Sequence, residues 1–251
     1  MTSGRKEAMR LSVILPVYAE TQSVIDTVEQ LEAGVPEETL HEIIIVISPK
    51  SGEESFRVCE GLRDSRDNVK LHVQQNNPGL GWAIREAFEL VTGTHALLMG
   101  SDLETDPAAV RQMIEKMQET GCDIVTANRW SRGGGFAGYS RLKLVCNYVF
   151  QKMLKLMFLT RLNDMTYGFR IMPADTVRSI RWQYTRHEFL LETILKPLRL
   201  GARIEEVPVK WISRTEGESK NTFFRNFNYL KVAFGVLFSR PSRYMIKESD
   251  Q

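Results

Sequence analysis

The first half of the chain alternates short runs rich in β-branched and aliphatic residues with longer amphipathic stretches. This alternation is typical of strand–helix–strand units that build a parallel sheet. We expect strands at residues 11–17, 42–47, 69–74, 96–99 and 123–126. Helices are expected between them, at about residues 21–33, 53–63, 80–91 and 107–120. The predicted fold class is therefore α/β, with a mostly parallel central sheet and flanking helices.

The second half is less regular. A glycine-rich loop at 131–138 precedes a helix at about 141–160, and further elements are expected at 188–200 (helix), 203–209 (strand) and 223–238 (aromatic helix). No internal repeat or low-complexity linker interrupts the sequence. We therefore predict one folded domain over residues 11–220, a disordered segment at 1–10 and a basic, aromatic amphipathic tail at 221–251.

Composition excludes several classes of protein. The 251 residues are 43% hydrophobic and 25% charged, as in ordinary globular domains. The N-terminus lacks the apolar core of a secretory signal, and no apolar run approaches the roughly 20 residues that span a bilayer. Three cysteines without paired spacing support neither a disulfide framework nor a zinc site. A cytoplasmic location is expected.

The net charge of +2 hides an uneven distribution. Residues 124–163 and 219–247 contain basic residues but no acidic one, so the rest of the chain is acidic. Such segments suggest an anionic partner: phosphate groups, a membrane surface or nucleic acid. No helix-turn-helix, RNP or zinc-finger signature is present, and the acidic remainder would repel a polyanion. Nucleic acid is therefore not an expected partner.

The helix expected at 141–160 has a narrow polar stripe at Lys143, Asn147, Gln151 and Lys155, and it is otherwise largely apolar. A helix that is apolar around most of its girdle is either covered on several sides or lies in a membrane interface. An interfacial helix would direct its lysines to anionic headgroups. Packing against the C-terminal helix or against a second subunit in a homodimer stays open.

One acidic loop follows a predicted strand. Asp102 and Glu104 lie two residues apart, so in extended backbone both carboxylates would project to one side and could share a hard cation such as Mg²⁺ or Mn²⁺. Asp106 is better explained as the N-cap of a helix that begins at Pro107. In open sheets of this kind, ligands bind beyond the carboxyl ends of the strands.

Eight short motifs occur in an order that resembles the family 2 glycosyltransferases of the GT-A fold. Within that family the chain is most similar to polyprenyl-phosphate sugar transferases of the dolichyl-phosphate mannose synthase type. The motifs are LPVYAE (15–20), EIIIV (42–46), NNPGLGWAIREAF (76–88), MGSDLETDP (99–107), IVTANRW with the following GGG (124–135), DMTYGFR (164–170), EVPVKW (206–211) and GESK (217–220).

The resemblance implies a GT-A catalytic domain over residues 11–220, with the helix at 141–160 on the acceptor side. It implies an inverting enzyme that moves a sugar from a nucleotide-diphosphate sugar to a dolichyl or undecaprenyl phosphate, peripherally at the cytoplasmic face of a membrane. Mg²⁺ or Mn²⁺ would be held by Asp102 and Glu104.

The same resemblance assigns residues to three groups. The catalytic residues would be Asp102, Arg129 and Arg132, and the acceptor phosphate would meet Arg129, Arg132 and Arg141. The donor-binding residues would be Pro16, Tyr18, Glu20, Ser48, Gly79, Gly81, Ser101, Asp102, Asp164, Glu188, Arg214 and Lys220.

Two departures from the family pattern are visible. The stretch 46–50 lacks the acidic pair that normally follows the second strand, and the Asp-x-Asp motif reads Gly100-Ser101-Asp102. Two alternatives therefore stay open: a transferase acting on a soluble or glycan hydroxyl, with Asp102 or Glu188 as general base, and a relative that binds nucleotide or lipid phosphate without transfer. Arg170 could be a ligand or part of an internal salt bridge.

Overall fold

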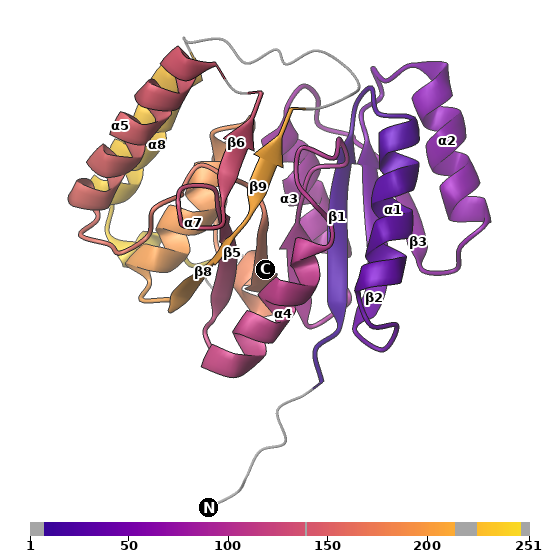
Figure 1. Cartoon of the computed structure of the whole chain (residues 1–251), viewed down its shortest axis with the longest axis horizontal. Helices are drawn as coiled ribbons and strands as arrows, with labels where there is room; N and C mark the ends of the chain where they lie inside the picture. Colours follow the sequence, from indigo (N-terminus) through magenta and orange to yellow (C-terminus); the bar gives the residue numbers. More distant parts are fainter. Residues whose placement is uncertain (1–7, 139, 214–224, 247–251) are drawn as a thin grey trace, which may run out of the picture.

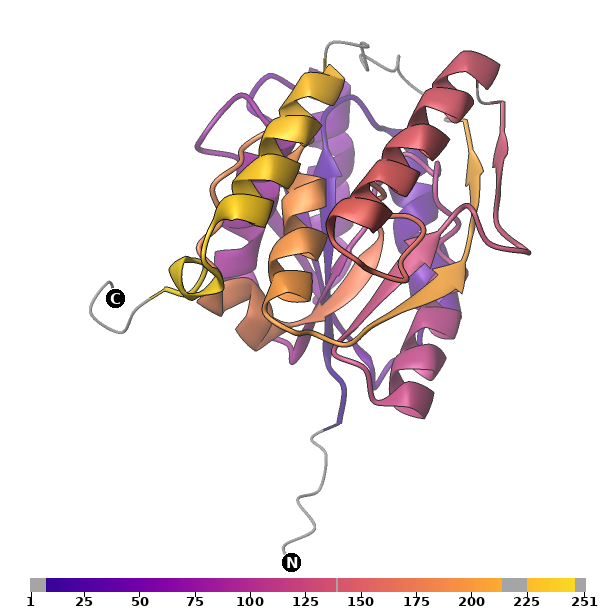
Figure 2. The same ribbon diagram turned by 90° about the vertical axis from the view of Figure 1, so that its left-hand side faces the viewer.

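The computed structural model describes residues 8–138, 140–213 and 225–246. A seven-stranded sheet is covered by helices on both faces (Figures 1 and 2). The elements are β1 (Leu11–Val17), α1 (Gln22–Gly34), β2 (Leu40–Ile47), α2 (Glu53–Asp64), β3 (Val69–Val73), α3 (Leu80–Leu90), β4 (His95–Leu98), α4 (Ala109–Thr120), β5 (Ile124–Asn128), β6 (Gly135–Ala137), α5 (Arg141–Met157), β7 (Arg170–Pro173), α6 (Ala174–Ser179), α7 (Phe189–Arg199), β8 (Ile204–Pro208), β9 (Lys210–Ile212), α8 (Arg225–Phe238) and a 3₁₀ turn (Pro241–Arg243).

The strands of the main sheet follow the order β3-β2-β1-β4-β7-β5-β8, and β6 and β9 form a small parallel sheet of their own. The β1–β2, β1–β4, β2–β3 and β5–β8 pairs are parallel, whereas β7 is antiparallel to both β4 and β5. The predicted α/β fold with a mostly parallel sheet is confirmed. In the first half, each expected element lies within about two residues of the observed one.

The expectations missed β6, β7, α6 and β9. β7 has only four residues, begins with an arginine and ends with a proline, so its sequence carries no alternating pattern. The helix expected to begin at Pro107 begins at Ala109. Asp106 nevertheless accepts a backbone hydrogen bond from Ala108 at 2.9 Å, in the turn that leads into α4. Residues 106–108 form this turn because the Asp106 carbonyl also accepts the N–H of Ala109.

Apolar side chains form one layer on each face of the sheet. Helices α1, α2 and α4 cover one face, and α3, α6, α7 and α8 cover the other. Val232, Ala233 and Val236 of α8 are buried, and α8 packs on α7. The described part of the predicted C-terminal tail therefore belongs to the folded body. The domain boundaries themselves remain a prediction.

A buried carboxylate, Glu42, joins neighbouring strands near their amino-terminal ends, opposite the carboxyl ends of β1–β5. Oε1 of Glu42 accepts hydrogen bonds from Ser12 Oγ at 2.6 Å and from the backbone N–H of Thr92 at 2.7 Å. Its Oε2 lies 2.5 Å from Lys70 Nζ. Burial acts to raise the pKa of Glu42, but the hydrogen bonds from Lys70, Ser12 and Thr92 outweigh it and lower the pKa to about 2.

We predict that Glu42→Gln lowers the free energy of unfolding by about 2–3 kcal/mol at pH 7. Because the folded-state pKa is depressed, this stabilisation is present above the ordinary pKa of 4.5 and is lost as pH falls toward about 2. Urea unfolding at pH 7 and pH 3.5 measures the difference. Glu54→Gln, which removes an exposed pair with Arg57, is the control and should change stability by under about 0.5 kcal/mol. Equal losses in the two variants would contradict the prediction.

Candidate active site

The loops that follow β1, β2, β3, β4 and β5 meet at one edge of the sheet, at the top of Figure 1. Their order follows from the parallel pairings, since neighbouring parallel strands bring their carboxyl ends together. Most of the residues predicted to bind the donor lie in or beside these loops, whereas Asp164 precedes β7, Glu188 precedes α7, and Arg214 and Lys220 fall outside the described residues. This edge is therefore the candidate site.

Several predicted donor-binding residues connect one loop to another. The carboxylate of Glu20 accepts the backbone N–H groups of Tyr18 at 2.6 Å and Ala19 at 3.0 Å, which closes its own loop. Ser101 Oγ donates to the carbonyl of Pro16 at 2.7 Å and joins the ends of β4 and β1. The Tyr18 side chain is exposed at the same edge. These bonds fix the backbone of the loops that follow β1 and β4.

Ser48 links the β2 loop to the β3 loop. Its hydroxyl accepts hydrogen bonds from Asn77 Nδ2 at 2.8 Å and from the backbone N–H of Lys50 at 3.2 Å. The β3 loop is held further by Glu86, whose carboxylate accepts the backbone N–H groups of residues 75 and 76. Ser48, which the resemblance assigns to the donor, thus joins two neighbouring loops of the site.

Gly79 and Gly81 are needed for a close contact within the protein. A Cβ on Gly79, which has a φ of +146°, would lie 2.0 Å from the carbonyl oxygen of Thr185. A Cβ on Gly81 would lie 2.6 Å from the carbonyl carbon of the same residue and 2.8 Å from Phe189 Cβ. The glycines therefore let the start of α3 pack against the backbone before α7, whereas the sequence suggested an approach to the donor.

The Asp102–Glu104 loop has a tighter geometry than expected. Leu103 has a φ of +55°, in the left-handed region, so the segment is not extended. The backbone N–H of Glu104 donates to Asp102 Oδ1 at 3.2 Å. The expectation that both carboxylates project from one side of an extended strand is therefore wrong in its geometry. The two residues lie in a turn and not in an extended strand.

The donor set of this turn fits a hard cation. Two carboxylates from one loop offer the oxygen ligands that Mg²⁺ and Mn²⁺ prefer, and the remaining positions could be filled by diphosphate oxygens and water. Glu104 Oε2 also accepts the indole N–H of Trp211 at 3.2 Å, which orients that carboxylate. Among the described residues no group of three or more His, Cys, Asp or Glu side chains is placed to hold a metal alone.

Arg129 and Asp164 form a buried ion pair. Arg129 Nε and Nη2 donate to the two carboxylate oxygens of Asp164 at 2.7 and 2.9 Å, and the backbone N–H of Arg129 donates to Oδ2 at 3.1 Å. The side chains are 7% and 0% exposed. The guanidinium also lies 4.2 Å from the ring centroid of Tyr167 and 5.0 Å from that of Phe136.

This geometry does not support two predicted contacts. The bidentate edge of Arg129, expected to meet the acceptor phosphate, is directed at Asp164. The Asp164 carboxylate, expected to contact the sugar, is enclosed by Arg129 and by Gln151, whose Nε2 donates to Oδ1 at 3.2 Å. Both residues have a structural role in the site, since they join the end of β5 to α5 and to the segment before β7.

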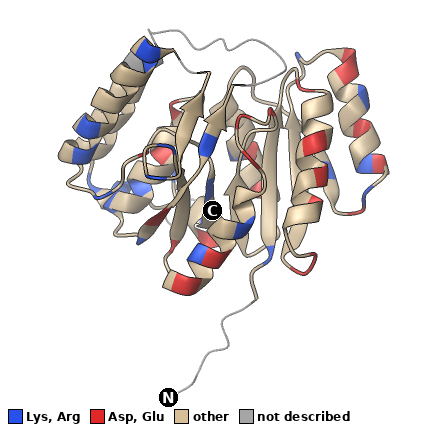
Figure 3. Cartoon of the chain, in the orientation of Figure 1, with Lys and Arg blue, Asp and Glu red and all other residues tan. Residues whose placement is uncertain are grey.

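Other predicted cations lie at the surface or outside the described residues. Arg132 and Arg141 are exposed, the first in the loop after β5 and the second at the start of α5. Arg214 and Lys220 fall outside the described residues. Figure 3 shows basic residues at the start of α5 and again in its second half. The α5 side of the site is therefore basic.

Two glutamates near α7 differ in their surroundings. Glu188 is half-buried immediately before α7, at its N-terminal end. Glu192 forms a buried pair with Lys196 at 2.6 Å and accepts the backbone N–H groups of Gln183 and Tyr184. Burial raises the pKa of Glu192 and lowers that of Lys196. The expectation that Glu192 is ion-paired rather than chemical is consistent with this geometry.

Arg170 lies beneath the site, at the start of β7. It is fully buried and donates to the carbonyl of Tyr167, while its Nε and Nη1 have no hydrogen-bond partner in the described structure. Burial lowers its pKa to about 9, so it remains a cation at neutral pH. The field of Asp164 acts in the opposite direction. Its burial fits an interior position, but no described carboxylate pairs with it, so the internal salt bridge left open by the sequence is not seen among the described residues.

The sequence reasoning missed three positioning residues. Gln151 donates to Asp164 and to Thr166 Oγ1, and its Oε1 accepts the N–H of Met165. Glu206 accepts the backbone N–H groups of residues 163 and 164, and Trp211 holds Glu104. Gln151 could have been found from the sequence, because it lies in the polar stripe of an otherwise apolar helix. Glu206 and Trp211 stand in the EVPVKW motif but carried no assigned role.

Comparison with known proteins shows which family this chain belongs to. The sequence profile described as Glycosyl transferase family 2 matches residues 12–181, which is more than half of the chain. The chain belongs to this family. The structure also resembles the crystal structure of glucosyl-3-phosphoglycerate synthase from Mycobacterium tuberculosis in complex with Mn²⁺, uridine-diphosphate and phosphoglyceric acid, with a TM-score of 0.68 over 94% of this chain and 81% of that one, at 16% identity. Another structure of that protein contains Mg²⁺ and uridine-diphosphate.

Two curated relatives are similar in sequence. Glycosyltransferase AglD of Haloferax volcanii is 24% identical over 87% of this chain, which spans only 35% of AglD. Undecaprenyl-phosphate mannosyltransferase of Micrococcus luteus is 27% identical over 84% of this chain and 87% of its own length. The family 2 membership and the fold predicted from the sequence motifs are thus confirmed.

We predict that Arg129→Met destabilises the protein by about 3–5 kcal/mol, because it leaves Asp164 charged, buried and without its partner. The double variant Arg129→Met with Asp164→Leu should recover much of that loss. Urea unfolding measures both, and Arg132→Met, at an exposed position, should change stability by under about 0.5 kcal/mol. A stable Arg129→Met protein would show that the pair does not organise the site.

Proposed function

We propose that this chain transfers a sugar from a nucleotide-diphosphate sugar to a polyprenyl phosphate at a membrane surface. The observation that carries the proposal is an exposed apolar face on α5 beside a site of the glycosyl transferase family 2 type. The names of the relatives support the same substrate class, since one is an undecaprenyl-phosphate mannosyltransferase. A phosphate at the end of a long apolar chain needs both a basic site and an apolar surface.

The α5 helix exposes large apolar side chains that a water-facing helix would normally bury. Leu142, Val145, Val149 and Leu156 are 73%, 60%, 60% and 75% exposed. Arg141, Lys143 and Lys152 lie on the same helix and are exposed as well. This mixture suits a helix that rests among acyl chains while its cations reach phosphate headgroups. Among the described residues, no helix is long and apolar enough to cross a bilayer.

The proposed reaction exchanges one phosphate ester for another at the anomeric carbon. The bond from this carbon to the diphosphate oxygen breaks, and an oxygen of the lipid phosphate forms a new bond from the opposite face, so the configuration inverts. The nucleoside diphosphate leaves with the electron pair. Because the attacking phosphate is already anionic at neutral pH, no side chain has to remove a proton.

The chain's own residues would then act by holding charge in place. Asp102 and Glu104 would bind Mg²⁺ or Mn²⁺, and the bound cation would neutralise the charge that develops on the diphosphate. Arg132 and Arg141 are the exposed arginines available for the acceptor phosphate, which arginine binds in bidentate geometry. Arg214 and Lys220 are proposed for the donor phosphates. The buried Arg129–Asp164 pair supports the backbone between these groups.

The direct test incubates the purified chain with labelled uridine, guanosine and cytidine diphosphate sugars, each with undecaprenyl or dolichyl phosphate. We expect a glycolipid that is extractable into organic solvent and is hydrolysed by mild acid. In parallel reactions that contain a glycan acceptor in place of the lipid phosphate, transfer to a hydroxyl would instead give a water-soluble product. Binding of a nucleotide sugar, seen as a raised melting temperature, without any product would favour a relative that binds but does not transfer.

We predict that Asp102→Asn lowers the turnover with Mn²⁺ or Mg²⁺ about 100-fold or more, because the site loses one of its two carboxylate charges. Initial rates with and without a chelator measure this. Asp106→Asn is the matched control from the same loop, since its carboxylate binds a backbone N–H of the turn before α4, and it should change the rate by under about threefold. Full activity of Asp102→Asn in the presence of chelator would remove the metal from the proposal.

We predict that replacing Val145, Val149 and Leu156 by serine reduces flotation with liposomes that contain anionic lipid. Each side chain would contribute about 1.5–3 kcal/mol when buried among acyl chains. Val73→Ser, at an exposed valine on the edge strand β3, is the control and should leave flotation unchanged. Unchanged flotation of the triple variant would contradict an interfacial role for α5.

A further inference from the structure

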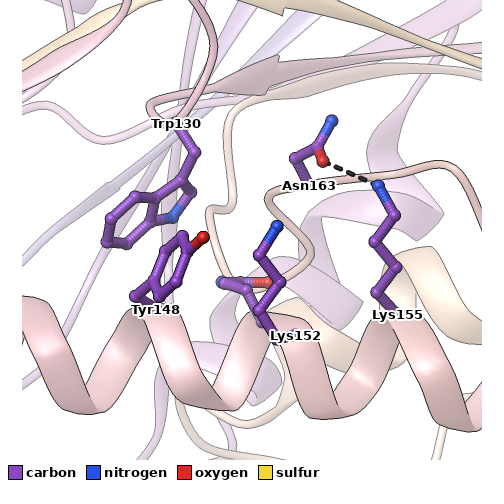
Figure 4. Close-up of a pocket in the computed structure, with 6 residues that line it drawn as sticks. Trp130, Tyr148, Lys152, Lys155 and Asn163 are labelled. Atoms are coloured by element: carbon purple, nitrogen blue, oxygen red, sulfur yellow. Dashed lines mark hydrogen bonds between the residues drawn. The ribbon is translucent and has the colours of Figure 1, made fainter.

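A cavity of about 140 Å³ lies between α5 and the two loops that border it. It is lined by Trp130, Tyr148, Gln151, Lys152, Lys155 and Asn163. Figure 4 shows the two lysine side chains rising from the helix into this space, with the Trp130 ring on one side and Asn163 on the other. We call it the α5 cavity. None of the assigned donor or acceptor residues lines it.

The α5 cavity is positively charged. Lys155 Nζ donates to Asn163 Oδ1 at 2.8 Å and to the carbonyl of Arg161 at 3.1 Å, which holds the ammonium group at the rim. Lys152 Nζ lies 5.0 Å from the ring centroid of Tyr148. None of the six described lining residues is acidic. The cavity therefore presents two cations without a carboxylate among them.

The acidic groups behind the cavity are bound to other partners. Asp164 is paired with Arg129, and its Oδ1 accepts Gln151 Nε2. Glu206 accepts the N–H and the Nδ2 group of Asn163 at 2.8 and 2.9 Å. Since these carboxylates are enclosed by donors, they compete little with an external anion for the two lysines.

Trp130 contributes a hydrogen-bond donor, its indole N–H, to the lining of the cavity. Its Nε1 is buried and has no hydrogen-bond partner in the described structure. The ring is held in place by Phe136 and Tyr148, at centroid distances of 4.6 and 5.3 Å. Leaving a buried donor unsatisfied costs about 1–3 kcal/mol, and an indole N–H can only donate. An anionic oxygen would satisfy it.

The surface beside the cavity is apolar. Tyr148, Val149 and Leu156 flank the two lysines along α5, and all three are strongly exposed. A ligand whose anionic end binds the lysines could therefore lay an apolar part along these side chains. This arrangement favours an amphiphile with an anionic end over a free ion.

We propose that the α5 cavity is a phosphate site, in which Lys152, Lys155 and the Trp130 indole N–H bind the phosphate monoester at the end of an apolar chain lying along α5. The identity of the ligand as a lipid rests on the proposed function, whereas the anion site rests on the cavity alone. The residues differ from the arginines assigned to the acceptor phosphate. The cavity therefore adds a holding position for the lipid phosphate on the acceptor side.

The test uses NMR of protein labelled with ¹⁵N at the tryptophan indoles. The chain has four tryptophans, so four indole N–H resonances are expected, and Trp130→Phe assigns the one of interest. Farnesyl phosphate, a water-dispersible lipid phosphate, is added below its critical micelle concentration, and inorganic phosphate and farnesol are added separately. We expect a downfield shift of the Trp130 proton with farnesyl phosphate, an affinity about tenfold or more above that of inorganic phosphate, and no such shift with farnesol.

Paired lysine variants complete the test. Lys152→Gln with Lys155→Gln should weaken farnesyl phosphate binding about tenfold or more, because two charge-assisted contacts are lost. Lys143→Gln, on the same helix but outside the cavity, should change it by under about twofold. Absence of a Trp130 shift, or equal weakening by Lys143→Gln, would overturn the anion site. Equal affinity for farnesyl and inorganic phosphate would overturn the assignment to a lipid.

These outcomes are independent of the transfer assay. If the protein forms glycolipid but its Trp130 resonance does not respond, the phosphate site in the α5 cavity is contradicted and the proposed function stands. If the Trp130 resonance shifts but no glycolipid forms, the lipid-phosphate site stands and the proposed transferase activity is contradicted.

Discussion

The buried pair of Arg129 and Asp164 is the interaction on which the arrangement around α5 depends. A single carboxylate receives the side chain and the backbone N–H of the residue that leaves β5, together with Gln151 from the middle of α5. The end of β5 and helix α5 are thereby fixed to one anionic group, while Glu206 of β8 accepts the backbone N–H of Asp164. Such a pair stabilises little by net charge attraction, since desolvation opposes it, but removing either partner leaves a costly buried charge. Its role is to hold β5 and α5 to the segment that carries Asp164.

The two sides of the candidate site differ in charge. The Asp102–Glu104 turn is acidic; Ser101 joins the end of β4 to β1, and Glu20 closes the loop that follows β1. Helix α5 and the loop after β5 carry arginines and lysines. In the function we propose, the acidic turn would hold a cation at the diphosphate and the basic side would receive the lipid phosphate, so no side chain would have to remove a proton. Asp164 and Glu206 are enclosed by donors, so they would repel an incoming phosphate little.

The regular part of the fold could be predicted from the sequence because the strands from β1 to β5 are short runs rich in β-branched and aliphatic residues, separated by amphipathic helices. The position of Asp102 and Glu104 at a strand end followed from the same pattern. Their turn did not, since the left-handed Leu103 has no signature that distinguishes it from an extended residue. β7 was missed because its four residues pair with strands far away in sequence, and tertiary context decides such a short strand. Arg129 was interpreted as a phosphate ligand because sequence alone cannot tell a surface arginine from one whose partner lies 35 positions away.

β7 also shapes how this architecture can diversify. The chain leaves the sheet at the end of β5 and returns through β7, which is the direct neighbour of β5. Residues 129–169, including the glycine-rich loop and α5, thus form an excursion whose two ends lie side by side. An excursion of this kind can be lengthened, shortened or replaced while the order of the strands stays the same. The strands β1 to β4 would not have to change. A chimera made at these two junctions would keep the seven-stranded sheet, whereas the small β6–β9 sheet, whose first strand lies inside the exchanged segment, would have to be rebuilt.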